Sequence, residues 1–203
     1  MRSVFIIPGE ATAKVLSAFR DRFPTVTLEL LIEGLGAVTQ KLLSEEASIG
    51  IGGPVTSEHP ALERRRLGEV ALIPVAAPDH PLARAIADGE DIIGQSRQHL
   101  QLVLADRSDL TEGREFSVIS PHTWRLGDLG AKHSLLKEGL GWGNMPRAMI
   151  AEDLANGTLV ELDLPEAPGA NYSLTGLWLR KAQPRPAGRW LMDEFEKQLA
   201  RCA

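Results

Sequence analysis

The chain has 203 residues, of which 43% are hydrophobic and 24% are charged, and its formal net charge is −5. This composition excludes a disordered or fibrous protein and allows one or two compact lobes, each with its own core. Phosphate backbones are bound by clustered lysine and arginine, so we do not expect so acidic a chain to contact DNA itself.

The cysteine content and the length of the apolar segments indicate the cellular compartment of the protein. The single cysteine, Cys202, excludes an intrachain disulfide, and nothing requires an oxidising environment. No apolar run reaches the ~20 residues of a membrane helix, and no secretion signal precedes the first apolar residues. We therefore expect a cytoplasmic protein that does not bind membranes.

Apolar runs alternate with amphipathic segments, which is typical of βαβ units in an α/β fold. In the first part of the chain, Val15, Leu16 and Phe19 share one face of a predicted helix that Pro24 ends. The predicted strands here are 4–7, 26–32 and 48–52, and the predicted helices are 12–22 and 38–45. We expect these elements to form a first lobe.

A long strand is predicted over 70–77, and two prolines, Pro78 and Pro81, end it. We place the first crossover between lobes here. Asp128 is a suitable N-cap for a helix, and Asn156-Gly157 is a suitable exit turn. The further predicted strands are 99–105, 116–119, 123–126, 140–145 and 173–179, and the further predicted helices are 128–138, 146–155 and 186–201. The predicted division is lobe I over 1–75 plus 175–203 and lobe II over 76–174.

The segment Gly139-Leu140-Gly141-Trp142-Gly143 has the glycine spacing of a dinucleotide-binding fingerprint. That fingerprint follows a strand and ends in a third glycine, whereas here a helix precedes the segment and Pro146 takes the place of the third glycine. We interpret Gly139 and Gly141 as backbone that ends a helix, and Pro146 as the start of a new one. Hydrolase and nucleotide triphosphatase motifs are absent from the sequence.

We expect neither a metal site nor a cofactor. The five histidines, His59, His80, His99, His122 and His133, lack the spacing that places two imidazoles on one metal. His122 has the best claim among them to a functional role, because it precedes Thr123-Trp124-Arg125. The basic run Arg64-Arg65-Arg66 is interpreted as a solvated edge, with an intersubunit contact as the alternative.

Small and polar residues follow several predicted strands, where helix N-termini of an open parallel sheet meet and ligands bind. Thr12 and Ser108 can donate hydrogen bonds, and Trp124 and Trp142 offer flat apolar walls. Arg125 could hold a carboxylate, whereas Glu10 opposes an anion, so an amine or a neutral phenol stays an alternative to an anionic or aromatic ligand. The predicted ligand-binding residues are Gly9, Glu10, Thr12, Leu35, Gly36, Ser108, Trp124, Arg125 and Trp142.

Three segments, in this order, resemble the effector-binding domain of LysR-type transcriptional regulators over nearly the whole chain. They are Leu16-Ser17-Ala18-Phe19-Arg20-Asp21-Arg22-Phe23-Pro24, Pro78-Asp79-His80-Pro81-Leu82-Ala83 and the block from Gly139 to Pro146. The resemblance implies a type 2 periplasmic-binding-protein fold, that is, two Rossmann-like lobes joined by two crossover strands. It also implies a small-molecule effector that binds between the lobes, and no enzymatic activity.

The resemblance further implies a homodimer, a tetramer in the full-length form, and DNA binding only through an N-terminal helix-turn-helix that we expect this sequence to lack. The Gly34-Leu35-Gly36 loop and Ser48 depart from the commonest patterns of the family, which leaves the class of effector open. A solute-binding protein for uptake and a lyase-type enzyme on the same fold are the alternatives.

Overall fold

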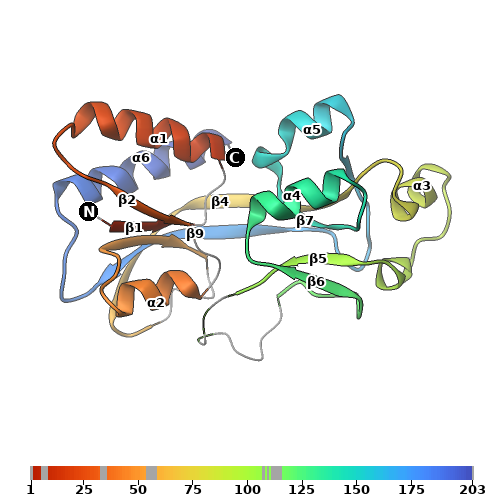
Figure 1. The fold of residues 1–203 in the computed structure, drawn as a ribbon, viewed down its shortest axis with the longest axis horizontal. Coiled ribbons are helices and arrows are strands. Elements are labelled where there is room, and N and C mark those ends of the chain that lie inside the picture. The colour runs from red at the N-terminus through yellow and green to blue at the C-terminus, as the bar shows by residue number, and fades with distance from the viewer. Residues whose placement is uncertain are drawn as a thin grey trace. The chain divides into compact units, whose positions relative to one another are not determined.

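The computed structural model describes residues 2–5, 9–32, 36–53, 59–106, 108, 110 and 116–202. The elements shown in Figure 1 are, in chain order, β1 (Arg2–Phe5), α1 (Gly9–Arg22), β2 (Glu29–Ile32), α2 (Ala37–Leu43), β3 (Ile49–Gly52), β4 (Leu62–Ala76), α3 (Pro81–Ala87), the 3-10 helix η2 (Gln95–Gln98), β5 (Gln101–Leu104), β6 (Thr123–Leu126), α4 (Leu129–Lys137), β7 (Gly143–Pro146), the 3-10 helix η4 (Arg147–Met149), α5 (Ala151–Asn156), β8 (Val160–Glu161), β9 (Ala170–Leu179) and α6 (Pro186–Cys202). Among the helices in these described ranges, none is both long and apolar enough to span a membrane.

The chain forms two compact units. Unit 1 comprises Met1–Val70, Asp106–Glu112 and Tyr172–Ala203, and unit 2 comprises Ala71–Ala105 and Gly113–Asn171. Two long strands, β4 and β9, each contain residues of both units. The prediction of an α/β fold with two crossover strands is therefore confirmed.

The sheet of unit 1 combines parallel and antiparallel pairing. Strand β1 pairs in parallel with β2 and with β3, as two βαβ crossovers require. Strand β9 then returns antiparallel to β3, with Leu177 opposite Gly50 and Thr175 opposite Gly52. The full strand order is β2-β1-β3-β9-β4-β7, and β8 also pairs with β4.

Helices α1 and α6 lie side by side on one face of this sheet, and α2 lies on the other (Figure 1). The predicted stripe of α6 is confirmed, because Leu191, Phe195 and Leu199 are all buried against Val15 and Phe19 of α1. Repeats of four residues place these side chains on one helical face, which explains why both segments are helical and pack together.

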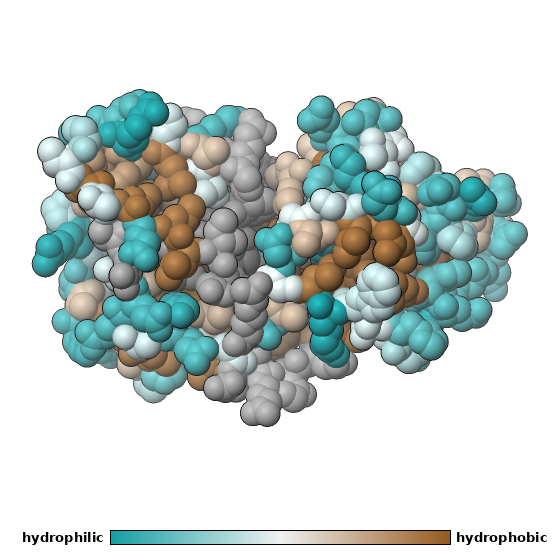
Figure 2. All heavy atoms as spheres, in the orientation of Figure 1, coloured by the Kyte–Doolittle hydropathy of each residue, from teal (hydrophilic) through white to brown (hydrophobic). Residues whose placement is uncertain are grey.

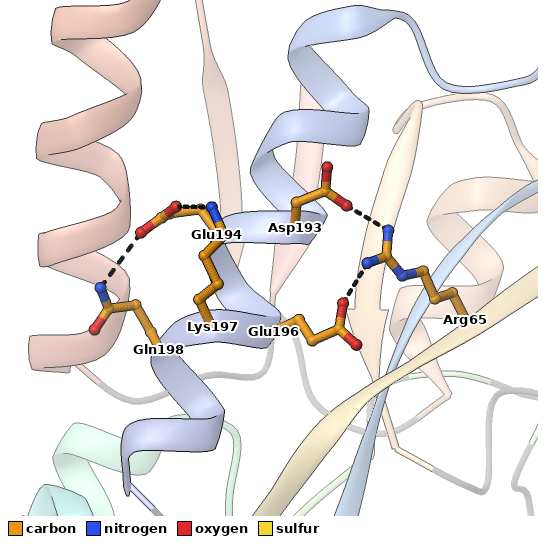
Figure 3. Close-up of polar contacts among 6 residues, drawn as sticks. All are labelled: Arg65, Asp193, Glu194, Glu196, Lys197 and Gln198. Carbon is orange, nitrogen blue, oxygen red and sulfur yellow. Dashed lines mark hydrogen bonds and ion pairs between the residues drawn. The ribbon is translucent and has the colours of Figure 1, made fainter.

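Strand β4 begins at Leu62, eight residues before the predicted start, so the basic run lies on a strand. Figure 3 shows Arg65 between two acidic residues of α6: it donates to Asp193 at 2.5 Å and to Glu196. On another side of α6, Glu194 accepts from Lys197 and Gln198. Arg65 is thus an intrachain link between sheet and helix, which the interpretation as a plain solvated edge missed.

Replacing Arg65 by Met keeps an aliphatic stem but removes both ion pairs. The three side chains are 40–47% exposed, so we expect the free energy of unfolding to fall by only about 0.5–1.5 kcal/mol. Urea denaturation measures this loss. Arg66→Met is the matched control, because Arg66 forms one more exposed pair with Glu69; a loss as large in the control would contradict the assigned role of Arg65.

In unit 2, β5 and β6 are parallel, with Leu102 opposite Trp124 and Val103 opposite Arg125. The segment before β7 pairs with β5 as well, since the Trp142 N–H donates to the Leu100 carbonyl and the Leu102 N–H to the Trp142 carbonyl. One core lies among β4, β5, β7, α4 and α5, and a second surrounds Trp142. The first consists of Ile73, Val75, Leu102, Leu136, Met145, Ile150 and Leu159, and the second of Ala76, Leu82, Ala83, Trp142, Leu162, Leu164 and Ala167.

Three predicted features of unit 2 are confirmed in detail. Asp128 is the N-cap of α4 and accepts from the Ala131 N–H at 2.6 Å. Gly139 and Gly157 both adopt the left-handed conformation that ends a helix. Gly141 has no room for a side chain, because a Cβ would lie 2.5 Å from the Leu100 carbonyl oxygen.

The two prolines follow the end of β4 at Ala76, as predicted, and Pro81 then lies in the first turn of helix α3, whose N-cap is His80. Two other predictions for this unit are wrong. Residues 116–119 form no strand, because the Gln101 side chain donates to the Ser117 carbonyl and accepts from the Ile119 N–H. Pro146 ends strand β7, and the predicted helix over 146–155 is divided into η4 and α5.

Candidate functional site

A polar cluster in unit 1 is built around the carboxylate of Asp106, which follows strand β5. Its Oδ2 accepts from the Gly36 N–H at 2.8 Å and from the Ser108 hydroxyl at 3.0 Å, and its Oδ1 accepts from the Ser108 N–H at 3.0 Å. Gly36 is the N-cap of α2 and supplies no side-chain cap, so Asp106 provides the negative group that a helix N-terminus favours. We call Gly36, Asp106 and Ser108 the Asp106 cluster.

Tyr172, at the start of β9, brings an unsatisfied hydroxyl close to this cluster. A Cβ on Gly53 would lie 1.8 Å from the Tyr172 hydroxyl oxygen, so only glycine permits this position. The hydroxyl is buried and has no hydrogen-bond partner among the described residues. Burial, and then the charge of Asp106, raise the pKa of Tyr172 to about 12. The phenol therefore stays protonated and keeps a donor for which the described structure supplies no acceptor.

The structure brings together two of the six predicted ligand-binding residues of unit 1, Gly36 and Ser108. Gly9 and Glu10 begin α1, and Thr12 is buried in its first turn. For Gly9 and Glu10 only the helical backbone is described, and Leu35 lies outside the described part of the chain.

Sequence reasoning missed Asp106 and Tyr172. The sequence could have predicted Asp106 as a site residue, since it is an acidic residue directly after a predicted strand. No sequence pattern predicts Tyr172, because its role depends on the close approach of Gly53, more than a hundred positions earlier.

The other predicted residues, Trp124, Arg125 and Trp142, lie in unit 2. Trp124 and Arg125 are on β6 and are exposed, Trp124 to 49%. Trp124 is one of the large apolar side chains that are exposed in the described part of the chain. Figure 2 shows apolar areas beside hydrophilic ones on one face of the molecule. Trp142 is fully buried, and its indole N–H donates to the Ser96 carbonyl at 3.1 Å. Trp142 is therefore part of the core of unit 2 in this structure and does not form the flat apolar wall that the sequence predicts.

Lys132 is a buried cation in unit 2. It is 4% exposed, and its Nζ donates to the Asn144 carbonyl at 2.8 Å. Gly143 leaves room for the lysine arm, since a Cβ there would lie 3.1 Å from Lys132 Cε. Burial lowers the pKa of Lys132 to about 8. The sequence gives no sign of this, because one lysine in an amphipathic helix is usually solvated.

We expect this lysine to make stability depend on pH. The pKa of a lysine side chain in an unfolded chain is about 10.4. Because the pKa of Lys132 is lower in the folded state, protonation of this lysine opposes folding. This loss of folding stability is absent well above about pH 10.4 and reaches its full size below about pH 8. Between pH 8 and 10 the free energy of unfolding should therefore rise, by up to about 3 kcal/mol, relative to a Lys132→Met variant. Urea denaturation across this range measures it, and parallel pH profiles of the two proteins would contradict it.

An ion-pair network fixes α4 to α5. The buried Asp153 carboxylate accepts from His133 Nε2 at 2.7 Å and from Lys137 Nζ at 2.9 Å. Burial alone would raise the pKa of Asp153, but the hydrogen bonds from Lys137 and His133 lower it overall. His122, the histidine with the best sequence claim, is exposed, and its carbonyl accepts from the Gln101 N–H. Within the described ranges, no group of three or more potential metal ligands is assembled.

Comparisons with known proteins agree with this architecture. Residues 7–200 match the family model described as the LysR substrate binding domain. The regulator AceR of Acinetobacter baumannii is 28% identical over 180 residues, which cover 85% of this chain and 57% of AceR. The chain thus spans little more than half the length of that relative.

Solved structures of the same family share the fold. The effector binding domain of QuiR in complex with shikimate has a TM-score of 0.72 at 17% identity, covering 99% of this chain and 97% of that one. The regulatory domain of CcmR from Synechocystis PCC6803 in complex with 2-PG also has a TM-score of 0.72 at 17% identity, covering 98% and 95%. At such identity these two structures show the type 2 periplasmic-binding-protein-like fold alone. The family match over 7–200 goes further: this chain belongs to the LysR substrate binding domain family.

Proposed function

We propose that the chain is the effector-sensing part of a LysR-type transcriptional regulator, and that the Asp106 cluster with Tyr172 is a contact surface for a small-molecule effector. The observation that carries this proposal is the buried Tyr172 hydroxyl, which has no acceptor among the described residues and lies near a carboxylate that accepts from Gly36 and Ser108. An unsatisfied buried hydroxyl costs about 1–3 kcal/mol, and an effector atom that accepts from it would recover this cost.

The cluster favours an effector that carries both an acceptor and a donor. Tyr172 supplies a hydrogen and Asp106 supplies oxygen lone pairs, so a hydroxy acid or an amino acid would complement both. The effectors of two neighbours, shikimate in QuiR and arginine in LysG of Corynebacterium glutamicum, have such combinations. A hydroxy acid belongs to the predicted anionic class, whereas an amino acid corresponds to the amine-bearing alternative.

Tyr172→Phe tests the proposal with little risk to folding. It removes one unsatisfied hydroxyl, so we expect an unchanged or slightly higher melting temperature and a loss of effector affinity of about 5–30-fold. Effectors would be found by calorimetry with small hydroxy, amino and aromatic acids, beginning with shikimate and L-arginine. A Tyr172→Phe variant that binds the effector as tightly as the parent chain would overturn the proposal.

The prediction that Trp124 and Arg125 contact the effector stays open to a separate test. Both side chains are exposed, so replacing either by Ala should leave the melting temperature within a few degrees and weaken effector binding. Arg147→Ala is the matched control, because Arg147 is an exposed arginine of the same unit that pairs with Glu161. Unchanged affinity in both variants would remove β6 from the binding surface.

The remaining proposals concern the whole protein. We propose that units 1 and 2 are lobes I and II of the effector domain, and that the full-length regulator is cytoplasmic and binds DNA through an N-terminal helix-turn-helix. The name of AceR, an HTH-type transcriptional regulator, and the share of its length that this chain spans support this. We also propose a homodimer of this domain and a tetramer of the full-length protein. Sedimentation that shows only monomer at high concentration would contradict the dimer.

A further inference from the structure

Unit 1 contains a cavity that the proposed effector contacts do not use. Its volume is about 700 Å³, and it lies where three connections of the chain meet: α1 to β2, α2 to β3, and β9 to α6. A cavity of this size is within the range of small-molecule sites. The lining residues that matter for binding are Phe23, Val26, Ile49, Leu179, Arg185 and Gly188.

The cavity and the Asp106 cluster lie at opposite ends of the sheet of unit 1. Strand β3 begins at Ile49, which lines the cavity, and the chain reaches the Tyr172 hydroxyl four residues later at Gly53. At about 3.3 Å per residue, this separates the two places by about 13 Å. Strand β9 runs the other way and ends at Leu179, beside the cavity. A molecule in the cavity is therefore not the effector bound at Tyr172.

One side of the cavity is apolar. Ile49 and Leu179 are buried, and Phe23 and Val26 are half-buried with part of their surface facing the space. Phe23 is held in place by Phe19 and Trp190, whose ring centroids lie 5.2 and 5.6 Å from its own. The apolar floor is thus preformed, which favours a ligand with a hydrocarbon or aromatic body.

The polar side of the cavity is positive. The exposed Arg185 lines it, next to the first turn of α6. The backbone N–H of the buried Gly188 donates to no acceptor among the described residues, and such orphan donors favour a negative group. Glu45 also lines the cavity, but its carboxylate is paired with Lys181 at 2.5 Å. The guanidinium of Arg185 is therefore the charge that would attract a ligand to this cavity.

We propose that this cavity is a second ligand site of the domain, and that it binds a small monocarboxylate with an apolar body. One guanidinium and the end of one helix match a single negative charge, whereas a phosphate dianion would require more donors. Such a ligand would connect the three loops that meet here. It would therefore stabilise unit 1 by mass action, whether or not an effector is bound.

Octanoate is a suitable probe, tested by calorimetry and by thermal denaturation of the full chain. With about ten heavy atoms, we expect a Kd of about 1 mM, and a rise in melting temperature of about 2–5 °C at 10 mM. Octan-1-ol, which lacks the charge, should bind at least five-fold more weakly. Absence of saturable octanoate binding up to 10 mM, or equal binding of the alcohol, would overturn the proposal.

Two variants locate the site and one controls for general effects of charge. Arg185→Glu reverses the charge and Ala182→Trp fills the cavity that Ala182 lines, so both should lose at least ten-fold in octanoate affinity. Arg189→Glu makes the same charge change one helical turn later, outside the lining, and should bind almost as the parent does. Equal losses in Arg189→Glu and Arg185→Glu would overturn the site. Tyr172→Phe should bind octanoate normally, which separates this inference from the proposed effector contacts.

Discussion

The antiparallel return of strand β9 against β3 is the contact on which unit 1 depends. The register that places Leu177 opposite Gly50 also buries Leu174, Leu177 and Leu179. Leu174 packs on the face covered by α1 and α6, and Leu177 and Leu179 pack on the face covered by α2. A slip by one residue would move each of the three to the wrong face. The same register places Tyr172 beside Gly53 at one end of the sheet and Leu179 at the cavity at the other. Both ligand proposals therefore follow from one strand pairing, which also brings α6 onto α1.

Buried polar groups are satisfied to very different degrees. The Asp153 carboxylate accepts from Lys137 and His133, and the Asp106 carboxylate accepts from Gly36 and Ser108. Lys132 donates to the Asn144 carbonyl, and the Tyr172 hydroxyl has no hydrogen-bond partner in the described structure. Because an unsatisfied buried group costs more than a satisfied one contributes, Lys132 and Tyr172 are positions where folding alone gives no reason for the residue. A contribution to binding is a reason for Tyr172.

The fold was predictable from the sequence wherever the cause is local. The four-residue repeat in α6, the Asp128 cap and the left-handed glycines act within one or two turns of chain, and the structure confirms each of them. The candidate site was only half predictable. Gly36 and Ser108 were found from their place after strands, but the atom that joins them belongs to Asp106, 70 positions from Gly36. Gln101 likewise holds residues 117–120 through side-chain hydrogen bonds that no periodicity reveals.

Asp106 also changes the charge expected of the effector. From the sequence alone, the helix N-termini that follow the strands are expected to attract an anion. At the N-terminus of α2 a negative group is already bound, because the Asp106 carboxylate accepts from the Gly36 N–H. A second negative group placed there would be repelled by Asp106 and would find one donor fewer. An effector group that meets this carboxylate must therefore donate a hydrogen, from a hydroxyl or an ammonium, while an acceptor on the same molecule meets Tyr172. A purely anionic effector is disfavoured at this surface, and a zwitterion or a hydroxy acid is favoured.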